Sequence, residues 1–100
     1  MPEQTYNIWL DDKSYLVVEF STVDGRVVSF VVRLMFISGN AEKCVARYDT
    51  AHGCPHLDVV DAQGRLREKK WLLGMSLAEA LRFAIDDFRL NYASYIKNFR

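Results

Sequence analysis

The spacing of apolar residues changes once along this chain, and that change constrains the fold more than any other feature. Up to Trp71 the apolar residues are largely β-branched or aromatic and gather in short runs between turn residues. After Ser76 they recur at every third or fourth position. The first pattern is typical of strands and the second of an amphipathic helix. The sequence therefore predicts an α+β fold, with five strands followed by one long helix.

Turn residues divide the first part of the chain into short segments. The five predicted strands are Tyr15–Val23, Arg26–Ile37, Lys43–Asp49, Leu57–Val60 and Arg65–Trp71. Asp24-Gly25 is the clearest hairpin signal, because a type I′ turn needs positive φ at both central residues. Short connections between consecutive strands favour a mostly antiparallel meander. In the second strand the even positions from Val28 to Phe36 are all apolar, so we expect them to face the core.

The last quarter of the chain carries the signals of one helix. Ser76 and Glu79 have the spacing of a capping box, which satisfies backbone amides at a helix N-terminus. The apolar stripe that follows predicts a helix from about Leu77 to Asn98, packed across one face of the sheet. The chain of 100 residues is expected to form a single domain. Residues 1–13 are expected to be a flexible or docked arm.

Charge and hydropathy exclude several classes of function. Thirteen Lys and Arg balance thirteen Asp and Glu, which argues against a wholly basic nucleic-acid binder but leaves room for a local basic patch. No segment reaches the roughly 18 consecutive apolar residues of a membrane span. The first ten residues contain no basic residue and no long apolar run, so a secretory leader is not expected. We therefore expect a cytoplasmic protein without a membrane partner.

The stretch from Arg47 to Asp58 holds the densest group of chemically able side chains. Both histidines of the chain, His52 and His56, lie there, with Asp49 and Asp58 on either side. Histidine can act as an acid or a base near neutral pH, and a carboxylate can orient its ring. The first interpretation is therefore a metal-independent acid–base pair, His52 and His56 oriented by Asp49, that cleaves a phosphodiester. Tyr48 and Asp58 would support that pair.

Two other interpretations of this stretch stay open. The histidines and one aspartate have donor types that suit zinc, manganese or iron, although their spacing matches no specific metal motif. The third interpretation is structural, in which Asp and His side chains tie down a loop through hydrogen bonds to the backbone. Of the three we take the metal-independent one as the expectation, with no cofactor and no metal.

The last predicted strand adds a group of cations. Arg65, Arg67 and Lys69 alternate, so they are expected to point to one face, and Trp71 follows them. Cations beside an aromatic ring can follow a phosphate backbone and stack a base. Arg47, Arg67 and Lys69 are therefore the expected RNA-phosphate contacts. The alternative is an edge strand whose charges prevent aggregation.

The stretch Tyr48-Asp49-x-Ala51-His52-Gly53-x-x-His56 resembles the Tyr-Asp-Asn-Ala-His-Gly-x-x-His stretch of the small bacterial TumE-like toxin family. In that family, too, the motif follows a few strands and precedes a single helix. The resemblance implies a toxin–antitoxin module with a helix-turn-helix antitoxin as partner. It also implies an RNA or translation target and a function centred on Asp49, His52 and His56. Thr50 stands where the family often has asparagine.

A second class of function competes with the toxin hypothesis. Long apolar strands such as Val27–Ile37 can pair with another chain through an exposed face or edge. The alternative is therefore a non-enzymatic interaction module that binds a partner protein, or a second copy of itself as a homodimer. A net charge of zero agrees with this alternative, because a ribonuclease gains from long-range attraction to RNA.

Overall fold

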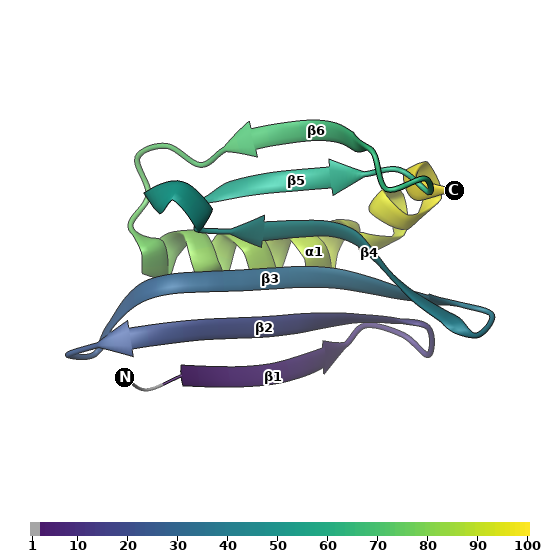
Figure 1. Cartoon of the computed structure of the whole chain (residues 1–100). Coiled ribbons are helices and arrows are strands. Elements are labelled where there is room, and N and C mark those ends of the chain that lie inside the picture. The colour runs from purple at the N-terminus through teal and green to yellow at the C-terminus, as the bar shows by residue number, and fades with distance from the viewer. Residues whose placement is uncertain (1–2) are drawn as a thin grey trace.

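One antiparallel sheet and one helix make up the fold (Figure 1). The computed structural model describes residues 3–100, apart from the side chain of His52. The strands are β1 (Glu3–Trp9), β2 (Ser14–Val23), β3 (Arg26–Ser38), β4 (Ala41–Asp49), β5 (His56–Val60) and β6 (Leu66–Trp71). They lie in the order β1-β2-β3-β4-β5-β6, each antiparallel to its neighbours. The predicted α+β meander with a C-terminal helix is confirmed.

The sheet has six strands rather than five, because part of the expected N-terminal arm forms β1. β1 pairs with β2 over its whole length, from Glu3 opposite Ser21 to Trp9 opposite Tyr15. The sequence does not predict this strand, because most of its side chains are polar and exposed. Only Ile8 packs against the core, so the apolar signal of a strand is weak.

The hairpin between β2 and β3 forms at Asp24-Gly25, as the sequence predicts. Asp24 has φ +50° and Gly25 has φ +78°, the positive values that a type I′ turn requires. The even residues of β3 from Phe30 to Phe36 are buried under the helix. Val28 is expected to share that face, but it is exposed: the pairing with β2 shifts register at Ser21/Thr22, which leaves Val28 without a partner, and Val27 packs against the core instead.

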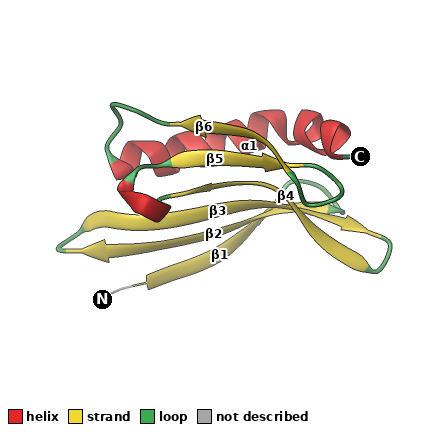
Figure 2. Cartoon of the chain, turned by 45° about the horizontal axis from the view of Figure 1, so that its top comes forward, coloured by secondary structure: helices red, strands yellow, loops and turns green. Residues whose placement is uncertain are grey.

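The helix α1 (Leu77–Phe99) covers one face of the sheet and packs mainly against β3, with contacts to β4 and β2 (Figure 2). Its capping box is complete: the Ser76 hydroxyl accepts from the Glu79 amide, and the Glu79 carboxylate accepts from the Ser76 amide. Ala80, Ala84 and Phe88 are fully buried against the sheet. Among the residues 3–100 no helix is both long and apolar enough to cross a membrane.

The capping box predicts a measurable contribution to stability. Ser76→Ala is expected to lower the free energy of unfolding by about 1 kcal/mol, because it leaves a backbone amide of the first turn without its acceptor. Urea denaturation followed by circular dichroism measures the change. Ser94→Ala, at an exposed position inside the same helix, is the matched control and is expected to be neutral or slightly stabilising. Equal losses in the two variants would contradict the capping role.

The other face of the sheet carries no helix, and we call it the open face (Figure 2). Strand register decides which side chains share it. One row across the open face contains Asn7, Val17, Arg33, Arg47, Asp58 and Lys69, and the next contains Thr5, Glu19, Val31, Asp49, His56 and Trp71. The charged residues of the Arg47–Asp58 stretch therefore lie on the side away from the helix.

Candidate functional site

Three neighbouring strands bring the charged residues of the motif together on the open face. Asp49 on β4 lies opposite His56 on β5, and Arg47 lies opposite Asp58. Lys69 on β6 then lies opposite Asp58, although it is eleven residues further along the chain. The structure thus assembles five of the eight predicted site residues into one cluster.

His56 is buried at the base of this cluster. It is 2% exposed, and the ring of Trp71 lies over it with a centroid distance of 5.0 Å. Its Nδ1 is 3.2 Å from the carbonyl oxygen of Cys54, which can only accept a hydrogen bond. Its Nε2 is 3.2 Å from Asp49 Oδ1 and 3.5 Å from Asp58 Oδ2. Both ring nitrogens therefore face groups of the protein itself.

The two carboxylates beside His56 are buried and carry cations on their outer side. Arg47 Nε donates to Asp49 Oδ2 at 2.9 Å, and Arg47 Nη2 donates to Asp58 Oδ2 at 3.3 Å. The Ala51 amide donates to Asp49 Oδ1 at 3.0 Å. Lys69 Nζ lies 3.3 Å from Asp58 Oδ1, but without the geometry of a hydrogen bond. Arg47 and Lys69 thus balance the two negative charges.

A third cation continues this arrangement on β3. Arg33 lies directly opposite Arg47 and forms an ion pair with Glu19 of β2. We call Arg33, Arg47 and Lys69 the cationic row. Their side chains are 37%, 49% and 36% exposed, so each presents part of its charge to solvent. The sequence does not predict Arg33 as a site residue. Its odd position in β3 indicates the open face, but only the register with β4 places it beside Arg47.

The predicted row of Arg65, Arg67 and Lys69 is wrong. A register shift between Val59 and Val60 breaks the simple alternation along β6. Arg67 donates to the Asn98 carbonyl at 2.6 Å and so reaches the C-terminal end of α1. Arg65 pairs with Asp61 in the preceding turn. Of these three cations only Lys69 belongs to the cluster, and Arg67 instead satisfies a carbonyl at the end of the helix.

Tyr48 also lies apart from the cluster, on the helix side of the sheet. It is 2% exposed, and its hydroxyl donates to Asp87 Oδ2 at 2.7 Å. Tyr95 donates to the same oxygen at 2.6 Å. Burial and the hydrogen bond to Asp87 raise the pKa of both phenols above the ordinary value. Tyr48 therefore joins β4 to α1 on the face opposite the cluster.

These phenols predict a loss of stability in alkaline solution. In the unfolded chain they ionise near pH 10, whereas the fold resists their ionisation because their pKa is raised. The free energy of unfolding is therefore expected to fall as the pH rises above about 10. Urea denaturation at a series of pH values measures this, and Tyr48→Phe is expected to make the fall shallower. An unchanged slope in that variant would contradict the contribution of Tyr48.

The structure describes the side chain of only one of the two histidines that are predicted to form an acid–base pair. His52 belongs to the short 3-10 helix η1 (Ala51–Gly53) between β4 and β5, but its side chain lies outside the described residues. His56, the other member, is buried and its nitrogens are engaged. His56 is therefore enclosed by the protein, with Nε2 directed at the neighbouring carboxylates.

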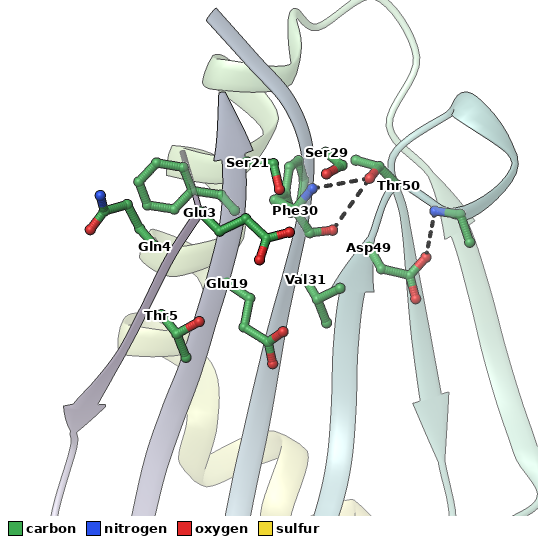
Figure 3. Close-up of a pocket in the computed structure, with 12 residues that line it drawn as sticks. Glu3, Gln4, Thr5, Glu19, Ser21, Ser29, Phe30, Val31, Asp49 and Thr50 are labelled. Atoms are coloured by element: carbon green, nitrogen blue, oxygen red, sulfur yellow. Dashed lines mark hydrogen bonds between the residues drawn. The ribbon is translucent and has the colours of Figure 1, made fainter. Parts of the chain in front are cut away.

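A cavity of about 480 Å³ opens on the open face beside Asp49. Strands β1, β2, β3 and β4 and the start of η1 line it. Figure 3 shows the carboxylates of Glu3 and Glu19 on the same side of the sheet as Asp49. Thr50 closes one end, where its hydroxyl bonds to the backbone of Phe30. The cavity gives solvent and small ligands a path to the edge of the cluster.

Comparison with known proteins identifies a family for this chain. No curated protein and no solved structure matches the chain. The family described as a domain of unknown function, DUF7718, matches residues 1–100. Because that match covers the whole chain, the protein belongs to the DUF7718 family.

Proposed function

We propose that this protein binds RNA on the open face of its sheet, as the toxin-like member of a bacterial toxin–antitoxin module. The observation that carries the proposal is the cationic row: Arg33, Arg47 and Lys69 come from three strands and lie in register on one exposed face. Strands lie about 4.8 Å apart, so the row spans about 14 Å. That is long enough to contact several phosphates of one strand.

The ion pairs beneath the row support this use of it. Each cation is held by a carboxylate, so its orientation is set before a ligand arrives. Arg47 uses Nε and Nη2 for Asp49 and Asp58, and its remaining N–H groups can donate to a phosphate. A positioned cation loses less side-chain freedom on binding than a mobile one.

An exposed aromatic residue extends the row at β6. Trp71 is 48% exposed, and Lys69 Nζ lies 5.3 Å from the centroid of its ring. An RNA base can stack on such a ring while a neighbouring cation contacts the phosphate. Single-stranded RNA suits this open surface better than a duplex, because its bases are available for stacking.

Cleavage of the bound RNA is part of the same proposal and rests on His52. Asp49 stands three residues before His52, and the Ala51 amide between them is bonded to Asp49. This places η1 against the cluster, next to the cationic row. We therefore assign both proton transfers to His52: it takes the proton of the attacking 2′-hydroxyl and returns it to the leaving 5′-oxygen as the P–O bond breaks, while Asp49 and His56 have a positioning role.

Binding of a labelled single-stranded oligouridylate, measured by fluorescence anisotropy, tests the proposal. Arg33→Gln and Lys69→Gln are each expected to weaken binding and to reduce the slope of log affinity against log salt by about 0.7. Arg65→Gln is the matched control, because Arg65 is equally charged but lies outside the row. No binding by the folded wild type, or equal losses in the control, would overturn the proposal.

The interaction module stays as a second candidate because β1 is the terminal strand of the sheet. β1 pairs only with β2, and Glu3 is its one charged residue. A second chain can add a strand along such an edge, which makes a homodimer the simplest product. Sedimentation velocity tests it: a dimer at micromolar concentration would favour this candidate, and a monomer would remove the homodimer.

A further inference from the structure

We propose that Asp49, His56 and Asp58 bind one divalent transition-metal ion beneath the cationic row. Each residue offers one donor atom, and the three atoms lie within 4.8 Å of one another. All three residues are buried, and they come from two adjacent strands rather than from a mobile loop. This inference does not depend on RNA binding and concerns the base of the cluster.

The distances within the group match those of a metal centre. Zinc bound at about 2.0–2.1 Å with tetrahedral angles places its ligand atoms about 3.3–3.5 Å apart. His56 Nε2 lies 3.2 Å from Asp49 Oδ1 and 3.5 Å from Asp58 Oδ2. The remaining pair, the two carboxylate oxygens, lies within 4.8 Å, so an ion fits between the three donor atoms once the side chains adjust.

The second ring nitrogen of His56, Nδ1, has the hydrogen-bond partner that is common for a metal-ligating histidine. Nδ1 faces the Cys54 carbonyl at 3.2 Å, so it must carry the hydrogen of that bond. In the neutral ring the lone pair is then on Nε2, the atom that points at the two carboxylates. A histidine that ligates a metal commonly donates its second N–H to a backbone carbonyl in this way.

The surroundings of Asp58 give a second, independent observation. Its Oδ1 is buried and has no hydrogen bond, and the residue is only 7% exposed. A buried carboxylate oxygen without a hydrogen-bond donor is costly. Lys69 Nζ lies 3.3 Å from Oδ1, and an ion bound by both oxygens of Asp58 would satisfy it as well. A metal ion between Nε2 and the two carboxylate oxygens would hold the three donor atoms together.

The positions of Arg47 and Lys69 are compatible with an ion at this site. Arg47 Nε bonds to Asp49 Oδ2 and leaves Oδ1 directed at His56. Lys69 lies by Asp58 Oδ1, while Oδ2 faces His56. Arg47 and Lys69 would then orient the ligating carboxylates from outside, as outer partners do in metal centres.

The donor set points to zinc or manganese. One imidazole nitrogen with carboxylate oxygens suits these ions, whereas calcium and magnesium prefer oxygen ligands alone. Three protein ligands leave at least one position for water or for a ligand oxygen, which is typical of catalytic rather than structural zinc sites. The cavity beside Asp49 offers that oxygen a path from solvent.

Titration of the untagged, chelator-treated protein with Zn²⁺ by isothermal calorimetry tests the proposal. We expect one ion per chain with a dissociation constant in the micromolar range or below. Asp58→Asn and His56→Gln are each expected to weaken binding at least tenfold. Asp86→Asn, which changes an exposed carboxylate of the helix, is the matched control and is expected to bind as the wild type does. Circular dichroism checks that each variant is folded.

A measurement on the wild type keeps the test decisive if both variants unfold. In the nitrogen-15 NMR spectrum, Zn²⁺ is expected to shift Nε2 of His56 and to leave its Nδ1 protonated. A folded wild type that binds no zinc or manganese would overturn the proposal, and so would zinc that leaves the His56 signals unchanged. Oligouridylate binding by metal-stripped protein separates this outcome from failure of the proposed function.

Discussion

Replacing Phe88 with alanine is expected to lower the free energy of unfolding by about 3–5 kcal/mol. Phe88 is fully buried at the centre of the contact between α1 and the sheet. Its ring lies 5.0 Å from that of Tyr48 and 5.3 Å from that of Tyr95, measured between centroids. The truncation removes buried apolar surface, leaves a cavity and loses two aromatic contacts. A domain of this size is commonly stable by about 5–15 kcal/mol, so the variant would be marginal.

Leu90→Ala is the matched control for Phe88→Ala. Leu90 lies two residues further along the same helix but is 82% exposed, so its truncation is expected to change stability by less than about 0.5 kcal/mol. Urea denaturation of both variants measures the difference. Similar effects in the two variants would mean that α1 does not pack on the sheet through Phe88.

Much of the fold could be predicted from sequence because its signals are local. The hairpin at Asp24-Gly25 and the capping box at Ser76 each depend on a few adjacent residues, and both form as expected. β1 could not be predicted in the same way. Its side chains are mostly polar, and it is a strand because its backbone pairs with β2. Such pairing depends on a neighbour more than on the strand's own composition.

The sequence predicts only those residues of the candidate site that lie close together along the chain. Asp49, His56 and Asp58 share one short motif, and β4 and β5 bring them together. Arg33 joins them through the register of β3 with β4, which no local pattern shows. Arg67 leaves the group because one irregularity in the pairing of β5 with β6 redirects it to the helix. Side chains alternate between the two faces of a sheet only where the strand has no bulge or register shift.

The burial of His56 changes what the motif can do. Two histidines four residues apart suggest a matched acid and base, but the structure encloses one of them between two strands and Trp71. A charge-balanced cluster forms around it, with Arg47 and Lys69 on the outside and two carboxylates inside. This pairing explains how a chain with no net charge can still present cations on one face.

Induced expression of the wild type is expected to arrest growth of a bacterial host, and His52→Ala is expected to abolish the arrest at a matched soluble level. The reason is the role proposed for His52 in cleaving bound RNA. The free energy of unfolding of His52→Ala is expected to lie within about 1 kcal/mol of the wild type, which urea denaturation checks. Co-expression of a helix-turn-helix protein encoded beside this gene is expected to restore growth.

Variants of the cationic row separate binding from cleavage in the same assay. Arg33→Gln with Lys69→Gln is expected to relieve the arrest as well, because RNA would bind too weakly, whereas Arg65→Gln is expected to leave it intact. Purified His52→Ala should still bind oligouridylate. A wild type that accumulates in soluble form without slowing growth would contradict the toxin proposal. If the arrest persisted in the double variant, the functional surface would lie elsewhere than the open face.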